Sequence, residues 1–244
     1  MNGPFLLDDK TILVTGASSG IGKETAIRIS QLGGRLIITG RNSSNLRNTF
    51  EQLEDNNHIY IEADLSIESE LSRLAEQLPE LDGVVYSAGI TGHLPVKFIS
   101  REEIERYFSI NFNSIVLLTA LLLKKKKLMN RSSLVFLSST ATRFPYFGGA
   151  LYSSSKAALE AYSKVLAVEL APKGIRANCI SPSFVKTPMV EGAAETISNE
   201  VLEKFEKMMP LGFGKPADVA NAILFLLSDA SGWITGTNLV LGGG

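Results

Sequence analysis

A tyrosine and a lysine stand four residues apart, at Tyr152 and Lys156, and a serine precedes the tyrosine by thirteen residues, at Ser139. Side chains at i and i+4 project from the same face of a helix, so the phenol and the ammonium can share one site. A free phenol titrates near pH ~10, and a neighbouring cation favours the phenolate and lowers this pKa. The serine hydroxyl could hold a carbonyl oxygen while the tyrosine protonates it. The alternative is an amphipathic helix that carries such a pair by chance.

A glycine-rich turn follows the apolar run at Thr11–Thr15 and precedes a helical pattern that extends to Leu32. A turn between strand and helix points backbone N–H groups at a pyrophosphate, at the positive end of the helix dipole. The three glycines suit a tight turn, a close approach to phosphate, and close packing of helix on strand. Glycines also mark ordinary turns, but strand before and helix after are the context that nucleotide binding requires. The residues predicted to bind here are Gly16, Ser18, Ser19, Gly20, Ile21 and Gly22.

The glycine spacing, taken with Ser139, Tyr152 and Lys156, resembles the short-chain dehydrogenase/reductase family, and most of all its 3-oxoacyl-(acyl carrier protein) reductases. The resemblance covers essentially the whole chain, because further motifs of the family follow in order. These motifs are Asp64-Leu65, Ala88-Gly89, Asn111, Asn178–Pro182, Thr187-Pro188, Ile234–Gly236 and Gly242-Gly243.

Three positions depart from the family's pattern. Ser87 stands where an asparagine amide would bridge neighbouring strands, Ser183 replaces a glycine, and Leu241 replaces an acidic or polar residue. None of these departures falls on the four catalytic positions that the resemblance implies.

The resemblance implies a role for each of four catalytic residues. Tyr152 would be the general acid in reduction and the base in oxidation, and Lys156 would lower the phenol pKa and hold the nicotinamide ribose. Ser139 would orient the substrate oxygen, and Asn111 would anchor a water that links Lys156 to solvent. For the cofactor, the resemblance implies contacts from Asp64, Leu65, Ala88, Gly89, Tyr152, Lys156, Pro182, Val185 and Thr187.

The end of the second expected strand, Thr39–Asn42, bears on the choice of cofactor. An acidic side chain there would accept hydrogen bonds from the ribose and repel a 2′-phosphate. This chain instead has Gly40 and Arg41, and a guanidinium grips a phosphate by charge and by paired donors. The sequence therefore predicts NADP(H), with Arg41 on the phosphate, although Arg41 could also be an ordinary exposed charge of a loop.

Seven apolar runs alternate with helical patterns along the chain. The expected strands are Thr11–Thr15, Arg35–Thr39, Ile59–Glu62, Val84–Ser87, Leu134–Ser138, Arg176–Ile180 and Leu239–Leu241, and the expected helices lie near 21–32, 44–54, 67–78, 101–127, 152–171 and 216–228. This alternation predicts an α/β fold, a Rossmann-type doubly wound parallel sheet of about seven strands with helices on both faces. Ligands of such sheets bind outside the carboxyl ends of the strands. The segment from Met189 to Gly214, which contains Gly192, Ala193 and Ala194, is expected to cover the substrate or to be a surface excursion.

Composition limits the remaining possibilities. The 244 residues, 45% hydrophobic and 20% charged, suit one soluble domain over 1–244. A net charge of -1 gives no reason to expect nucleic acid. The single cysteine, Cys179, suits a reducing cytoplasm and is expected to be a packed, inert thiol. His58 and His93 are not spaced as metal ligands would be. No signal-peptide pattern is expected at the start of the chain, and no apolar run reaches the ~18 residues of a membrane span.

The sequence leaves the substrate open. The length of the chain resembles that of the 3-oxoacyl-(acyl carrier protein) reductases, whose partner is acidic, and Lys124–Lys127, Arg131 and Lys173 could form a basic rim for it. Aromatic residues before Tyr152 could equally line a pocket for a free hydrophobic ketone, a steroid or a sugar alcohol. A non-catalytic NADP-binding sensor or scaffold is a distant alternative. Because the matching helices of the family form an interface, we expect a homotetramer or a homodimer.

Overall fold

The computed structural model describes residues 3–54, 57–190, 206–207 and 209–242. One parallel sheet, in the order β3-β2-β1-β4-β5-β6-β7, joins all the strands named in this part of the chain. They are β1 (Thr11–Thr15), β2 (Arg35–Gly40), β3 (Ile59–Glu62), β4 (Leu81–Tyr86), β5 (Leu128–Leu137), β6 (Arg176–Pro182) and β7 (Asn238–Leu241). The strand order reverses between β1 and β4, which confirms the doubly wound fold and places a ligand-binding crevice at that point.

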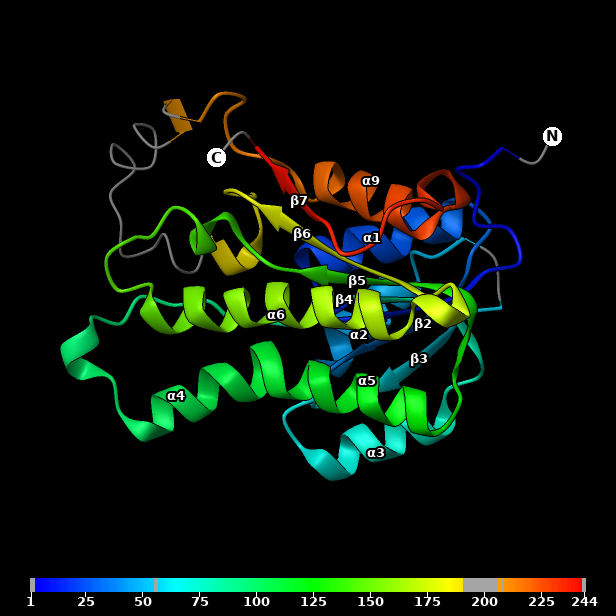
Figure 1. Ribbon diagram of the computed structural model, residues 1–244, viewed down its shortest axis with the longest axis horizontal. Coiled ribbons are helices and arrows are strands. Elements are labelled where there is room, and N and C mark those ends of the chain that lie inside the picture. Colours follow the sequence, from blue (N-terminus) through cyan, green and yellow to red (C-terminus); the bar gives the residue numbers. More distant parts are fainter. Residues whose placement is uncertain (1–2, 55–56, 191–205, 208, 243–244) are drawn as a thin grey trace.

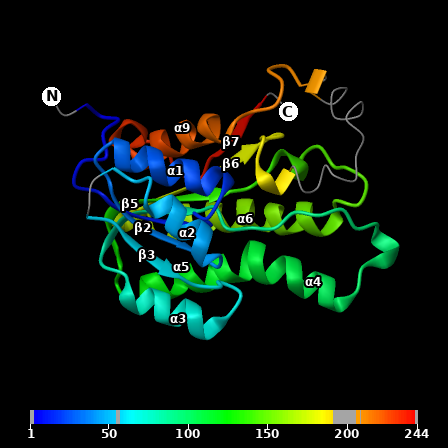
Figure 2. The ribbon, with the colours of Figure 1, turned by 180° about the vertical axis from the view of Figure 1, so that it is seen from behind.

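Helices cover both faces of the sheet (Figure 1). On one face lie α1 (Gly20–Gln31) and α9 (Pro216–Leu227), which pack on each other, with α2 (Ser43–Phe50) beside them. On the other face lie α3 (Glu68–Gln77), α5 (Ser114–Lys124) and α6 (Ala150–Glu169), as the view from behind also shows (Figure 2). The α4 helix (Arg101–Phe108) leads into α5.

Side chains along each strand point alternately to the two faces of the sheet, and they form a separate hydrophobic core on each face. In β1, Leu13 packs toward α3 and α5, whereas Ile12 and Val14 pack toward α1 and α9, and all three side chains are fully buried. Successive side chains of a strand point to opposite faces, so a strand that is apolar throughout must be covered on both sides. Burying each such side chain contributes about 1.5–3 kcal/mol. The rigid sheet that results fixes the strand ends that carry the site.

The structure corrects three element boundaries. β5 begins at Leu128 rather than at Leu134, because its polar first half still pairs with the start of β4 through Leu128 and Leu81. β4 accordingly starts at Leu81 and ends at Tyr86. The single helix expected over 101–127 is interrupted by a π-turn at Ser109–Asn113 and ends at Lys124. Neither the early pairing nor the π-turn produces a hydrophobic period that a sequence pattern could reveal.

The helical stretch Arg101–Lys124 is long and apolar enough, by length and composition alone, to cross a membrane. Its apolar side chains include Ile115, Leu118 and Leu122, which are buried in the core against the sheet. A core helix of a globular protein passes the same test of length and composition. Ile104 and Leu117 of the same stretch are exposed, so the stretch packs on the core along one side only.

Candidate functional site

The turn between β1 and α1 brings three backbone segments into very close contact. Gly16 has a left-handed backbone (φ 67°), and a Cβ at this position would stand 2.7 Å from the backbone nitrogen of Ala88. A Cβ on Gly22 would overlap the carbonyl oxygen of Gly16, so this glycine permits α1 to pack on the turn. Ser19 caps α1 without a side-chain hydrogen bond in the described structure, and the first turn carries no acidic residue. The positive end of α1 is therefore open to an anion.

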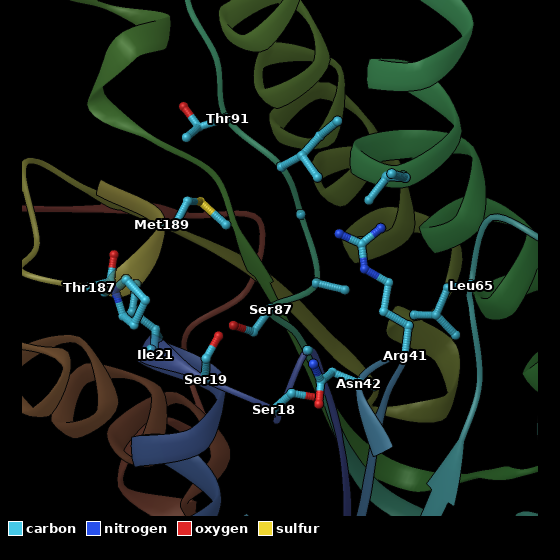
Figure 3. Close-up of a pocket in the computed structure, with 18 of the residues that line it drawn as sticks. Ser18, Ser19, Ile21, Arg41, Asn42, Leu65, Ser87, Thr91, Thr187 and Met189 are labelled. Atoms are coloured by element: carbon cyan, nitrogen blue, oxygen red, sulfur yellow. The ribbon is translucent and has the colours of Figure 1, made fainter. Parts of the chain in front are cut away.

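A cleft of about 940 Å³ opens at the carboxyl ends of β1, β2 and β4 (Figure 3). Most of the predicted cofactor residues line it, namely Gly16, Ser18, Ser19, Gly20, Ile21, Arg41, Asp64, Leu65, Ala88, Gly89 and Thr187. Gly22, Tyr152, Lys156, Pro182 and Val185 do not line this cleft. The sequence analysis missed the lining residues Asn42, Asn45, Ala63, Ser66, Ser87, Ile90, Thr91, Gly92, His93, Ile110 and Met189. Asn42, Ser66 and Ile90 directly follow predicted positions, and Ala63, Ser87 and Ile110 directly precede them, so adjacency in the chain was the signal that could have found these six.

The end of β2 combines an exposed cation with a buried, unpaired hydroxyl. Arg41 extends into the cleft in Figure 3. The pKa of Asp64 is lowered, mainly by the hydrogen bond from Ser66 and to a smaller extent by the charge of Arg41. Ser66 donates to Asp64 from its backbone nitrogen at 2.9 Å and from its hydroxyl at 2.7 Å. The Ser18 hydroxyl is buried against Gly40 and has no hydrogen-bond partner in the described chain. An open helix end, an unpaired hydroxyl and an arginine together suit a dinucleotide with an additional phosphate.

Tyr152 and Ser139 meet at the carboxyl end of β5. Ser139 begins the short helical turn Thr140–Thr142, and its Oγ accepts a hydrogen bond from the backbone nitrogen of Ala141 at 3.2 Å. Its proton is therefore free to be donated. Burial raises the pKa of Tyr152 to about 12, and the hydrogen bond with Ser139 opposes this rise.

The expectation that Lys156 lowers the pKa of Tyr152 is wrong for this structure. Lys156 is buried, its Nζ donates to the carbonyl oxygen of Leu137 at 2.8 Å, and it stands 5.9 Å from the centre of the Tyr152 ring. Burial lowers the pKa of Lys156 to about 8. Because the ammonium is bonded elsewhere, loss of solvent around the phenol outweighs its attraction for the phenolate.

Two of the residues predicted to be catalytic, Lys156 and Asn111, border the cleft at Gly89. A Cβ on this glycine would stand 3.3 Å from Lys156 Nζ and 3.2 Å from Asn111 Oδ1. A side chain here would crowd both groups, so the glycine leaves them more room beside the cleft wall. The structure thus brings Lys156 and Asn111 together at a position that also lines the cofactor cleft.

Asn111 uses its side chain to connect β4 to α6. Its Oδ1 accepts from the backbone nitrogen of Ile90 at 2.8 Å, and its Nδ2 donates to the Ile90 carbonyl and to the Ser155 hydroxyl, both at 3.0 Å. The π-turn at Ser109–Asn113 places Asn111 here, fully buried. The side chain therefore positions the loop after β4, and the water relay stays a prediction.

Two loops form an aromatic wall beyond the catalytic tyrosine. Leu94 donates its backbone N–H to the Gly148 carbonyl at 2.8 Å, and the Tyr146 hydroxyl donates to the Gly92 carbonyl at 3.2 Å. The rings of His93 and Phe147 stand 5.6 Å apart. Phe144, Tyr146 and Phe147 are exposed, with 54%, 41% and 74% of their surface accessible. Gly92 and His93, which contact this wall, also line the cleft.

Two expectations made from the sequence change in the light of the structure. The basic rim of Lys124–Lys127, Arg131 and Lys173 lies at the amino ends of β5 and β6, whereas the catalytic residues lie at the carboxyl ends. β5 separates the two by up to ~33 Å at 3.3 Å per residue, so within one chain the rim does not border the cleft.

The asparagine missing at Ser87 is compensated by Thr15, whose hydroxyl accepts the backbone N–H groups of Ser87 and Ala88 at 3.1 and 3.2 Å.

The thiol of Cys179 is buried, as expected. It donates to the hydroxyl of Ser163, and burial raises its pKa to about 11. A thiol in this state has no nucleophilic character at neutral pH. In the described residues no group of three or more metal-ligating side chains gathers. Within Met189–Gly214, the segment expected to cover the substrate, residues 191–205 and 208 lie outside the described residues, and so does Gly243.

Comparison with known proteins identifies the family. A family model described as enoyl-(acyl carrier protein) reductase matches residues 16–244. The 3-oxoacyl-[acyl-carrier-protein] reductase of Rickettsia felis is 35% identical, with 98% of this chain and 97% of the relative covered. The chain belongs to the short-chain dehydrogenase/reductase family.

A further relative and a solved structure of the family match the chain over nearly its whole length. The L-xylulose reductase of Caenorhabditis elegans is 34% identical, with 97% of this chain and 95% of the relative covered. A short-chain dehydrogenase/reductase from Mycobacterium ulcerans superposes with a TM-score of 0.88 at 30% identity, covering 98% of this chain and 90% of that one. The chain is thus an oxidoreductase of a family that uses a nicotinamide cofactor.

Proposed function

We propose that this chain is one catalytic domain that reduces a ketone to a secondary alcohol with NADPH, and that its substrate is a 3-oxoacyl thioester. The observation that carries the proposal is the half-buried Ser139–Tyr152 pair, with the buried Lys156 beside it at the Gly89 wall of the cleft. A phenol and a hydroxyl that donate toward one point are suited to a carbonyl oxygen on which negative charge develops.

In the mechanism that we propose, Ser139 donates a hydrogen bond to the carbonyl oxygen and Tyr152 gives that oxygen its proton. NADPH, when bound, would supply the hydride. A phenol with a pKa of about 12 is protonated at neutral pH, so Tyr152 rests in the form that reduction requires. Lys156, with a pKa of about 8, is mainly cationic at neutral pH and lies where it would hold the nicotinamide ribose.

The preference for NADPH is argued from the end of β2. Arg41 and the unpaired Ser18 hydroxyl would bind the 2′-phosphate, and Asp64 would bind the adenine amino group. Position 40 is a glycine rather than an acidic residue, so no carboxylate stands there to repel that phosphate. Pro182, Val185 and Thr187 would enclose the nicotinamide, of which Thr187 lines the cleft.

A thioester substrate is supported by the names of several relatives, which are 3-oxoacyl-[acyl-carrier-protein] reductases. A second candidate substrate is a free hydrophobic ketone or a sugar. The aromatic wall of Phe144, Tyr146 and Phe147 favours an apolar ketone, and the L-xylulose reductase among the relatives favours a sugar.

An acyl carrier protein could reach the cleft of one chain from the basic rim only if a second subunit supplied that rim. We propose a homotetramer or homodimer, because Val165 and Val168 of α6 expose 53% and 76% of their surface and Leu117 of α5 exposes 43%. A cytoplasmic location is part of the proposal, and the lone unpaired cysteine is consistent with it.

The experiment that tests the function is NADPH oxidation measured against a panel of substrates. The panel contains 3-oxoacyl thioesters, the matching enoyl thioesters, free aliphatic and aromatic ketones, and ketoses. Turnover of 3-oxoacyl thioesters above all others supports the proposal, and turnover of free ketones or ketoses supports the second candidate. Tight NADPH binding without turnover of any substrate would identify the non-catalytic alternative and refute the proposal.

A further inference from the structure

A single carboxylate oxygen collects three hydroxyl groups directly behind the catalytic residues. Oε1 of Glu160 accepts hydrogen bonds from Ser138 at 2.8 Å, from Thr142 at 2.8 Å and from Ser181 at 3.2 Å. Ser138 and Ser181 are buried, and none of the ion pairs found in the described chain includes Glu160. The side-chain oxygens of a glutamate carry several lone pairs, so one glutamate suits a cluster of hydroxyl donors.

The three hydroxyl groups come from segments that carry the proposed chemistry. Ser138 directly precedes Ser139, and Thr142 ends the short helical turn that Ser139 begins. Ser181 directly precedes Pro182 at the end of β6. Glu160 therefore holds Ser139 from both sides and holds β6 next to it.

Glu160 stands on the same face of α6 as Tyr152 and Lys156, because residues four apart on a helix lie one above the other. The acid and the serine that orients the substrate oxygen belong to different elements, and Glu160 links those elements. Alternative acceptors exist for two of the donors, since Ser138 also lies 3.2 Å from the Lys156 carbonyl and Thr142 lies 3.0 Å from the Ser139 carbonyl. Without the carboxylate the two hydroxyl groups would turn to these carbonyl groups, and the loop would lose its connection to α6.

We infer that Glu160 is a positioning residue that sets the distance between Ser139 and Tyr152 through Ser138, Thr142 and Ser181. Hydrogen bonds to a charged acceptor are about twice as strong as those between neutral groups. Displacing a catalytic group by about 1 Å can reduce a rate by ~10²-fold. The inference rests on the proposed ketone reduction, since it concerns the same site.

The test compares Glu160→Gln with Glu169→Gln, an exposed glutamate of the same helix. We expect Glu160→Gln to lower kcat for the ketone by about 10- to 100-fold, while KM and the dissociation constant of NADPH, measured by fluorescence titration, stay within about threefold. Glu169→Gln should behave as wild type. A kcat of Glu160→Gln within twofold of wild type overturns the inference, and so does an equal loss of NADPH binding, which would indicate a general structural defect.

A second variant keeps the inference testable if Glu160→Gln does not fold. Thr142→Val removes one donor at nearly constant shape, and we expect kcat to fall severalfold with NADPH binding unchanged. In the double variant with Glu160→Gln the losses should not add, because both act through one hydrogen bond. Additive losses, or a Thr142→Val enzyme as fast as wild type, would overturn the role of the carboxylate. A wild-type protein that reduces no ketone would instead refute the proposed function.

Discussion

Replacing Arg41 with alanine tests the proposed cofactor at one side chain. If Arg41 pairs with the 2′-phosphate, Arg41→Ala removes a charge-assisted hydrogen bond that NADPH makes and NADH does not. Such bonds contribute about 1.5–3 kcal/mol, which corresponds to a factor of about 10–150 at ~1.4 kcal/mol per factor of ten. Arg41 is exposed, so screening by salt places the expectation in the lower part of this range, at about 10- to 30-fold.

The assay is kcat/KM for NADPH and for NADH at two ionic strengths, in wild type and in Arg41→Ala. The loss should appear with NADPH alone, and in wild type the preference for NADPH should shrink as salt is added. Lys23→Ala is the control, because Lys23 is another cation near the turn and its ammonium already donates to Asn48 at 3.1 Å. Equal use of both cofactors by wild type, or an equal loss with both in Arg41→Ala, would refute the assignment.

Three further predictions concern the cofactor end, the lysine and the assembly. Gly40→Asp should weaken the binding of both cofactors, because a Cβ at position 40 would overlap the Ser18 hydroxyl. The double variant Ser18→Gly/Gly40→Asp should recover the use of NADH but not of NADPH, and titration with each cofactor would show this. The rate of ketone reduction should fall as the pH rises through about 8, where Lys156 loses its proton, and Lys156→Arg should abolish this fall. A wild-type rate that stays constant up to pH ~10 would contradict the role of the ammonium. Light scattering at micromolar concentration should give a dimer or a tetramer, and Val168→Lys should shift it toward the monomer, whereas a monomeric wild type would refute the interface.

The sequence was sufficient for the elements that have a strong local pattern. The apolar run at Thr11–Thr15 and the glycines after it predicted both β1 and the turn that lines the cleft, because the backbone conformation of that turn requires glycine at specific positions. The parallel sheet followed from alternation alone, since βαβ units have one handedness. The Tyr152–Lys156 pair was also found, because both residues lie in one regular helix.

Other features depend on tertiary contacts that leave no periodic signal. The π-turn that places Asn111 and the early start of β5 arise from pairing with distant segments. The direction of the Tyr152 pKa was predicted wrongly, because the sequence shows the neighbouring cation but neither the burial of the phenol nor the bond from Lys156 to Leu137. Glu160 was not recognised, because its three partners come from three separate segments.

Tyr152→Phe tests most directly the central claim that Tyr152 protonates the substrate. The substitution keeps the ring and removes the hydroxyl that we propose as the proton donor, so kcat for ketone reduction should fall by about 10²- to 10⁴-fold, the range for loss of a general acid. NADPH binding should be nearly unchanged, and Tyr162→Phe on the same helix should keep wild-type activity. A Tyr152→Phe enzyme within a few-fold of wild type would contradict the mechanism.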